Sequence, residues 1–157
     1  MIRPATAADL PSIADLICEL AEYERLAHAI VRDAALLHEH LFGTRPYAEV
    51  LMAEEAGAVV GFALFFHTYS TFRSQPGIYL EDLFVRPAFR GRGHGKALLA
   101  ALARIAIERA CARLEWSVLN WNEPAIGFYR ALGAKEMNEW SVFRLTDSAL
   151  HALARVE

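Results

Sequence analysis

Residues 79–99, YLEDLFVRPAFRGRGHGKALL, hold the residue types most suited to chemistry in this chain. Two adjacent acids, Glu81 and Asp82, lie in an apolar, strand-like run, and RGRGHGK (residues 90–96) then leads into a helical pattern. Glycines let backbone N–H groups converge on one point, and a helix N-terminus adds positive potential. With its basic residues, this turn is a candidate metal-free site for a phosphate or pyrophosphate. The alternative is a glycine-rich turn with solvated basic side chains.

Two other glycine signatures do not match this turn. A P-loop requires four residues between its first glycine and its Gly-Lys pair, and a Ser or Thr directly after that pair. Only three residues separate Gly91 from Gly95, and Ala97 follows Lys96. A dinucleotide fingerprint requires Gly-x-Gly-x-x-Gly after the first strand of the unit. Here the glycines alternate with single residues in the middle of the chain, so neither signature applies.

Composition limits the class of protein. The chain has 157 residues, of which 55% are apolar and 22% charged, and its net charge is -3. These values indicate one globular domain over residues 1–157 and disfavour a nucleic-acid partner. No apolar run has membrane-spanning length, and the N-terminus lacks the apolar core of a signal peptide. Cys18 and Cys111 form neither a disulfide framework nor a metal motif. We therefore expect a cytoplasmic protein with no metal and no membrane or nucleic-acid partner.

Periodicity and turn signals place these residues on elements of an α/β (α+β) fold. Helix caps are expected at Thr6, at Asp33, and at Asn120 or Asn122, and Gly133 is expected to end the helix before it. One mixed sheet flanked by helices follows from the order of elements. The pattern predicts strands at 2–5, 48–55, 58–69, 78–85, 113–119, 134–138 and 140–145, and helices at 7–26, 34–42, 95–110, 123–132 and 147–156.

Several motifs, taken together, resemble one enzyme family. RGRGHG matches the Arg/Gln-x-x-Gly-x-Gly/Ala signature of the GNAT acetyltransferases, and NWNEPAIGFYRALGA (residues 120–134) resembles that family's next strand-helix segment. Residues 2–24, 59–72, 79–85 and 120–130 are similar to the spermidine/spermine (diamine) and thialysine acetyltransferase branch. The resemblance covers nearly the whole chain.

The resemblance implies a mostly antiparallel sheet of about seven strands, splayed at a slot for the cofactor. It implies acetyl-CoA as donor, a small cationic amine as acceptor, direct attack in a ternary complex, and a homodimer. Main-chain groups of the strand at 83–85 would pair with the pantetheine arm, and those of the turn would hold the pyrophosphate. The residues implied for cofactor binding are Leu83, Phe84, Val85, Arg90, Gly91, Arg92, Gly93, His94, Gly95, Lys96, Asn122, Glu123, Pro124 and Ala125.

Catalysis of this reaction requires a base and an acid. An alkyl amine has a pKa near 10.4, so roughly one molecule in a thousand is unprotonated at pH 7. The resemblance implies Glu81 as the base, acting through a water, and Tyr129 as the general acid for the departing thiolate. The main-chain N–H of Leu83 would stabilise the oxyanion. Regular strand alternation places Asp82 on the opposite face from Glu81, in a structural role or as the partner of a nearby base.

Acceptor residues are implied by the same branch. The candidates are Tyr23, Glu24, Glu81, Glu115, Trp116, Ser117 and Glu139. Polyamine and thialysine-like acceptors both stay open, because the segment after Gly133 is shorter than in the polyamine enzymes. Arg73, in the expected loop 71–77, favours an acceptor that carries a carboxylate.

Other readings of the same residues stay open. A GNAT fold could act on a protein or peptide amine or on an aminoglycoside, or could bind acyl-CoA as a non-catalytic sensor. A long loop after Ser70 would cover the slot and favour a small acceptor.

Overall fold

The computed structural model describes residues 1–156. Residues 1–119 form one compact unit, and the residues from Asn120 onward form a second. The first unit contains a five-stranded sheet in the order β1-β2-β3-β4-β5, antiparallel except for the parallel pair β4-β5. The strands are β1 (Ile2–Pro4), β2 (Glu49–Glu55), β3 (Ala58–Ser70), β4 (Gln75–Val85) and β5 (Leu114–Trp116).

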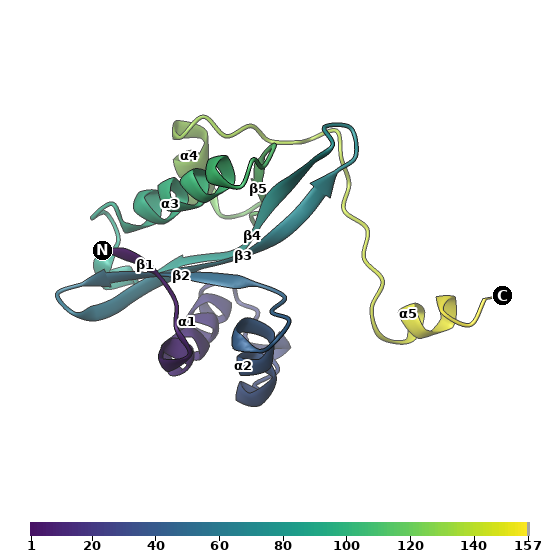
Figure 1. The fold of residues 1–157 in the computed structure, drawn as a ribbon, viewed down its shortest axis with the longest axis horizontal. Coiled ribbons are helices and arrows are strands. Elements are labelled where there is room, and N and C mark those ends of the chain that lie inside the picture. The colour runs from purple at the N-terminus through teal and green to yellow at the C-terminus, as the bar shows by residue number, and fades with distance from the viewer. Residues whose placement is uncertain (157) are drawn as a thin grey trace. The chain divides into compact units, whose positions relative to one another are not determined.

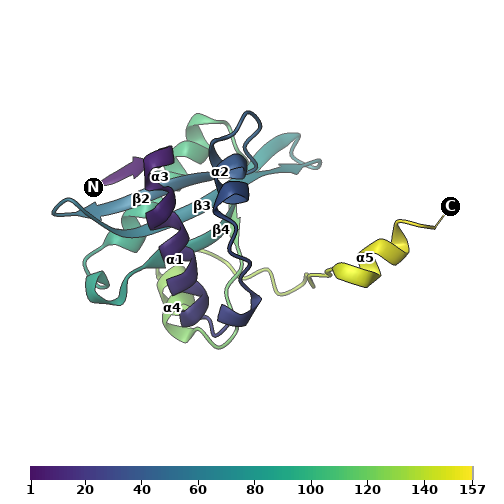
Figure 2. The same cartoon turned by 90° about the horizontal axis from the view of Figure 1, so that it is seen from below.

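Helices cover both faces of this sheet. Figure 1 shows α1 (Leu10–Tyr23) and α2 (Ala34–Phe42) on one face and α3 (His94–Glu108) on the other. In Figure 2, α1 and α2 lie across the strands on their shared face. Short 3₁₀ turns at Ala7–Asp9, Ala27–Ala29 and Pro87–Phe89 connect these elements. The α/β class expected from the sequence is confirmed.

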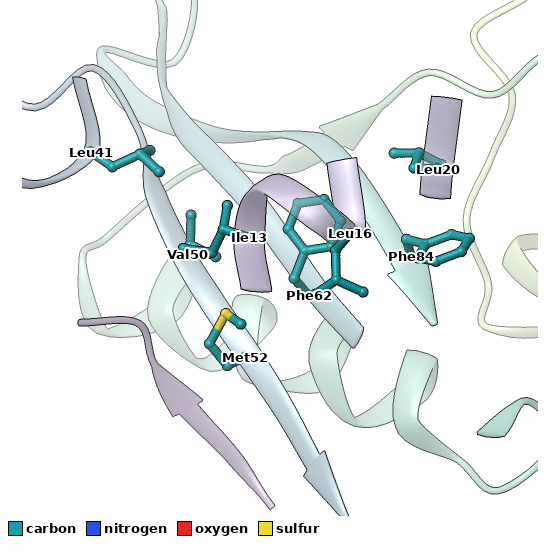
Figure 3. Packing of buried hydrophobic residues seen from close by; sticks show 8 residues of the cluster. All are labelled: Ile13, Leu16, Leu20, Leu41, Val50, Met52, Phe62 and Phe84. Carbon is teal, nitrogen blue, oxygen red and sulfur yellow. The ribbon is translucent and has the colours of Figure 1, made fainter. Parts of the chain in front are cut away.

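The α1 face of the sheet holds a hydrophobic core. Helical spacing directs Ile13, Leu16 and Leu20 to one side of α1, and all three are buried. They pack with side chains from three strands and from α2, as Figure 3 shows. Burying each such side chain stabilises the fold by about 1.5–3 kcal/mol. This packing fixes the end of α1 against β4. The strand and α2 members of the cluster are Leu41, Val50, Met52, Phe62 and Phe84.

Ion pairs fix the start of α1 to the sheet edge. The Arg3 guanidinium donates hydrogen bonds of 2.7 and 2.8 Å to Asp9 and of 2.6 and 2.8 Å to Glu54. The Asp9 carboxylate also accepts from the main-chain N–H and the hydroxyl of Thr6. These hydrogen bonds, chiefly those from Arg3, hold the pKa of Asp9 far below its usual value. Thr6 is the N-cap residue of the 3₁₀ turn that leads into α1, as expected.

A β-bulge in the β3-β4 pair changes which side chains face α1. Leu64 pairs with Asp82 and Phe65 pairs with Leu80, so Glu81 is the extra residue. Phe84 belongs to the core under α1, and alternation places Asp82 on that same face. Beyond the bulge, Leu80 is buried on the other face. The bulge therefore turns Asp82 toward α1.

The second unit contains α4 (Glu123–Ala131) and α5 (Asp147–Leu153). The hairpin predicted at 134–138 and 140–145 is wrong, because the described part of this unit contains no strand. Its alternating apolar pattern suits a strand, but a strand forms only where its backbone finds a partner. Trp140, Val142 and Phe143 are accordingly exposed. The described sheet therefore has five strands, not about seven.

The end of one predicted strand and the length of one predicted loop also differ from the structure. The strand predicted at 113–119 is limited to Leu114–Trp116, and β4 begins at Gln75. The connection from β3 to β4 is therefore a turn of residues 71–74, and the predicted loop 71–77 is wrong. This turn is too short to be the long cover expected over a slot.

Gly61 allows β3 and β4 to approach closely, and Gly61→Ala should destabilise the protein by about 1–3 kcal/mol. A Cβ at this position would lie 2.5 Å from the main-chain oxygen of Phe84 and 3.1 Å from the Cα of Val85. Urea unfolding measures the change. Gly127→Ala is the matched control, since it lies on α4 with nothing within 4 Å and should be neutral or stabilising. Equal midpoints for Gly61→Ala and the wild type would contradict the steric argument.

Candidate active site

The glycine turn presents main-chain N–H groups at the start of α3. Gly91 and Gly93 adopt left-handed φ values of 76° and 89°. The first bond into the helix runs from Ala97 N–H to the Gly93 oxygen at 2.9 Å, so the N–H groups from His94 to Lys96 have no partner within the helix. A Cβ at either left-handed glycine would meet open space. This arrangement of donors fits a diphosphate group.

Arg90 connects this turn to β4 and α1. Its Nε–H donates to the Val85 oxygen at 2.9 Å, and its guanidinium lies 4.5 Å from the centre of the Tyr23 ring and 5.4 Å from that of Phe84. Such cation–π contacts stabilise by about 0.5–1 kcal/mol at exposed sites. The Arg90 guanidinium therefore already has protein partners. Main-chain N–H groups contribute more to anion binding at this turn than the basic sequence suggests.

The β4 strand has a free edge directly before the glycine turn. Its pairing with β5 is restricted to Ile78–Leu80 against Leu114–Trp116, while β4 continues to Val85. From Glu81 onward β4 is paired with β3 on one side only. Main-chain groups along this edge can therefore pair with an extended, amide-containing ligand as an added strand would. The splay expected between these two strands stays a prediction, because β5 ends at Trp116.

An acidic cluster lies at the beginning of this edge. Burial, together with the negative charges of Glu81 and Glu24, raises the pKa of Asp82 to about 6. Burial also raises the pKa of Glu24. Because like charges in a half-buried site repel one another, a cation bound here would be stabilised. The cluster therefore favours a cationic ligand.

The structure brings the α1 candidates to this cluster. Tyr23 ends α1 with its ring 6.4 Å from that of Phe84, and Glu24 follows it at the helix C-cap. Glu24 thus lies near enough to Asp82 for its charge to raise that pKa, while Tyr23 packs against Phe84 of the same strand. The opposite placement of Glu81 and Asp82 stays a prediction, because the bulge at Glu81 interrupts regular alternation. No local signal in the sequence marks that bulge.

The candidates near β5 have other partners. Glu115 forms a 2.7 Å ion pair with Arg113, and the Ser117 hydroxyl lies 2.7 Å from the Tyr79 hydroxyl. Trp116 is half-buried and pairs with Leu80 at the end of the short β5 ladder. Because Arg113 compensates its charge, Glu115 is a weaker candidate for a cation than Asp82.

Arg73 lies far along the strand from the acidic cluster. It is in the β3-β4 turn, and the seven residues from Gln75 to Glu81 span roughly 20 Å of extended strand. Arg73 therefore lies away from the acidic cluster, and its expected place near the acceptor stays a prediction.

The second unit carries the remaining candidates. Asn122 caps α4 by accepting a 3.4 Å hydrogen bond from the Ala125 N–H, with Glu123 and Pro124 in the first turn. Tyr129 is half-buried, and its ring centre lies 5.4 Å from that of Phe128. Gly133 ends this helix with φ 88°, as expected, and the Ala134 N–H donates to the Tyr129 oxygen at 3.2 Å. Glu139 is exposed beyond this helix.

Comparison with known proteins agrees with this geometry. The model of the acetyltransferase (GNAT) family matches residues 12–134. The chain belongs to the GNAT acetyltransferase family. This GNAT protein is 38% identical to a thialysine N-epsilon-acetyltransferase of Bos taurus, over 98% of this chain and 96% of that protein. It is 32% identical to the L-ornithine N5-acetyltransferase NATA1 of Arabidopsis thaliana, over 99% and 88% of the two chains.

A solved structure shares the fold of this GNAT chain. An integron cassette protein from the mobile metagenome of V. cholerae matches it with a TM-score of 0.84 and 27% identity, over 99% of this chain and 98% of that one. Within residues 1–156, no group of three or more His, Cys, Asp or Glu side chains is arranged to hold a metal ion. No helix in the same part is long and apolar enough to cross a membrane.

Proposed function

We propose that this GNAT enzyme transfers the acetyl group of acetyl-CoA to a primary amine of a small cationic acceptor, by direct attack in a ternary complex. The observation that carries the proposal is the acidic cluster of Glu24, Glu81 and Asp82 at the free edge of β4, directly before the amide-lined turn. The anion-binding turn suits the diphosphate of acetyl-CoA, and the acidic cluster on the same strand suits a cationic amine.

Binding of the donor would use main-chain groups. The N–H groups of residues 91–96 would hold the diphosphate, and β4 from Leu83 to Val85 would pair with the pantetheine amides. Family resemblance assigns Asn122, Glu123, Pro124 and Ala125 to the same ligand. Acetyl-CoA supplies the activated acetyl thioester when it is bound.

Four groups of the chain would move or hold charge. Glu81 takes the ammonium proton through a water, and Asp82, whose pKa is raised, follows it in the chain. A carboxyl with a pKa of about 6 accepts protons efficiently near neutral pH. The Leu83 N–H stabilises the negative charge on the acetyl oxygen, and Tyr129 gives a proton to the departing sulfur.

Acceptor recognition would combine the acidic cluster with Tyr23. The named activities of the relatives, on thialysine and ornithine, suggest a diamine-like or thialysine-like acceptor with two amines separated by a short chain. Glu115, Trp116, Ser117 and Glu139 stay weaker candidates for the far end of that acceptor. The short β3-β4 turn removes one argument against a peptide acceptor, which is therefore the second candidate.

An acceptor screen tests the proposal. We expect thiol release from acetyl-CoA with diamines, polyamines, thialysine or ornithine at a kcat/KM at least about tenfold above that for peptide amines, a difference of about 1.4 kcal/mol. A preference for peptides would replace the small-amine assignment. Binding of acetyl-CoA without turnover of any amine would favour the sensor reading, and no binding of acetyl-CoA would reject the proposed function.

The proposal includes a homodimer in the cytoplasm. The exposed apolar residues of the segment after α4, among them Trp140 and Phe143, support an oligomer, because a monomer in water leaves such side chains unburied. Light scattering on the purified chain measures the mass. A mass of one chain at micromolar concentration would contradict the dimer.

A further inference from the structure

One carboxylate outside the predicted site contacts the glycine turn. Glu55 ends β2, and each of its oxygens binds a different residue of the turn. Its Oε2 lies 2.6 Å from His94 Nε2, and its Oε1 accepts a 2.5 Å hydrogen bond from Arg92 Nη1. These two residues flank Gly93. A single side chain therefore joins both sides of the left-handed glycine to the sheet.

We propose that Glu55 is a positioning residue that holds the glycine turn in the shape that binds the donor's diphosphate. The inference rests on the proposed function, and it assigns no contact between Glu55 and the donor itself. Glu55 acts through the turn.

The turn needs such a support because its own residues provide few contacts that fix its conformation. Gly93 is the N-cap of α3 without a side-chain cap, and the first turn of the helix contains no acidic residue. A Cβ added at Gly91 or Gly93 would have no neighbour within 4 Å, so packing does not fix these two residues. Holding one residue in a single conformation costs about 1–2 kcal/mol of conformational entropy. A restraint made before binding reduces what the ligand must order.

The side chains of Arg92 and His94 bind other parts of the protein and are not needed to contact the diphosphate. Arg92 also donates to the Ala88 oxygen at 3.2 Å, and its guanidinium lies 5.3 Å from the centre of the Phe89 ring. The His94 side chain is 13% exposed. Both side chains are thus held on the β2 side, which leaves their main-chain N–H groups for the ligand. This division explains how a turn rich in basic residues can bind through its backbone.

Two effects of Glu55 on anion binding oppose each other. Its negative charge repels a phosphate, and its restraint of the turn favours one. The hydrogen bonds from His94 and Arg92 keep the pKa of Glu55 below its usual value, so it is ionised at neutral pH. However, the carboxylate is paired with the Arg92 guanidinium, which cancels much of its field at short range. Loss of the restraint therefore dominates.

The test measures the turn and the ligand separately. In Glu55→Ala, calorimetry should show the Kd of acetyl-CoA raised about tenfold, while kcat at saturating donor stays within about twofold. In the free protein, ¹⁵N relaxation at Gly91, Gly93 and Gly95 should show order parameters falling from about 0.85 toward 0.6. Glu55→Gln, which keeps hydrogen-bonding atoms without the charge, should be intermediate in both measurements.

Glu49→Ala is the matched control. Glu49 begins the same strand and forms an ion pair with Arg109 at 2.5 and 2.8 Å, at the end of β2 away from the turn. This variant should leave both the Kd and the glycine order parameters unchanged.

Each outcome decides one of the two claims. A rigid turn in Glu55→Ala would overturn the positioning role, whatever the ligand does. A mobile turn with an unchanged or lower Kd would overturn its link to donor binding. If the wild type itself binds no acetyl-CoA, the proposed function fails and the link fails with it, while the relaxation data still judge whether Glu55 holds the turn.

Discussion

Replacing Tyr129 with phenylalanine should lower kcat roughly a hundredfold to ten-thousandfold, with the Kd of acetyl-CoA changed by less than about twofold. The phenol is the proposed proton donor to the departing sulfur, and phenylalanine keeps the ring that lies 5.4 Å from Phe128. A thiol of pKa near 8.5 leaves as a thiolate, so proton donation matters most when that charge develops. Initial rates of thiol release over pH 6–10 measure kcat, and the alkaline limb of the profile should be lost in the variant.

The control for this variant is Tyr47→Phe. Tyr47 is an exposed tyrosine after α2 whose ring lies 5.0 Å from that of His40, and its hydroxyl has no part in the proposed reaction. Its kcat should equal that of the wild type. Wild-type turnover in Tyr129→Phe would remove this tyrosine from the chemistry and leave the leaving thiolate to be protonated by water.

Local patterns predicted the parts of the site whose geometry is set by neighbouring residues. The RGRGHG turn requires left-handed backbone at Gly91 and Gly93, which glycine adopts readily, and the structure has it at both. Asn122 caps α4 and Gly133 ends it for equally local reasons. The free edge of β4 beyond Leu80 is present in the observed pairing, because β5 pairs only with Ile78–Leu80.

Long-range register was not available from such patterns. Whether Asp82 faces α1 depends on the bulge at Glu81, which arises in the pairing of β3 with β4 and not in either strand alone. Glu55 and His94 are 39 positions apart, and their contact exists only after β2 reaches the start of α3. The hairpin predicted at 134–145 failed for the same reason, since an alternating pattern does not supply the strand with which it must pair.

The carboxylates of Glu55 and Asp82 have pKa values that are shifted in opposite directions. Glu55 has hydrogen bonds with His94 and with the cationic Arg92, and its pKa is lowered. Asp82 is half-buried beside two other acids, and its pKa is raised. A paired charge, as at Glu55, suits a structural support, whereas an unpaired charge, as at Asp82, suits a site that binds a cation. The bulge therefore has a functional consequence, because it places an acid that costs stability where an amine is proposed to bind.

Replacing Asp82 with asparagine should raise the free energy of unfolding at pH 7.5 by about 2–3 kcal/mol. The pKa of Asp82 is about 6 in the folded protein against 3.8 for an unperturbed group, and one pKa unit corresponds to about 1.4 kcal/mol. Between those two values the folded state binds more protons than the unfolded state. The stability of the wild type should therefore fall as pH rises from about 4 to about 6 and change little above that.

Urea unfolding of the wild type and Asp82→Asn from pH 4 to pH 8 measures this difference. The gap between the two should be small near pH 4 and reach its full size above pH 6. Asp9, whose pKa is lowered, loses its stabilising effect only in stronger acid and does not contribute in this window. Asp15→Asn, on the exposed face of α1, is the matched control and should show a constant, small offset.

The same variant should also raise the KM for the amine, because the cation loses the charge that attracts it. Stability and acceptor affinity would then change in opposite directions, as expected where a site retains an unfavourable charge for its ligand. A variant that is less stable than the wild type at pH 7.5 would mean that Asp82 is already compensated by the protein. The acidic cluster would then no longer argue for a cationic acceptor.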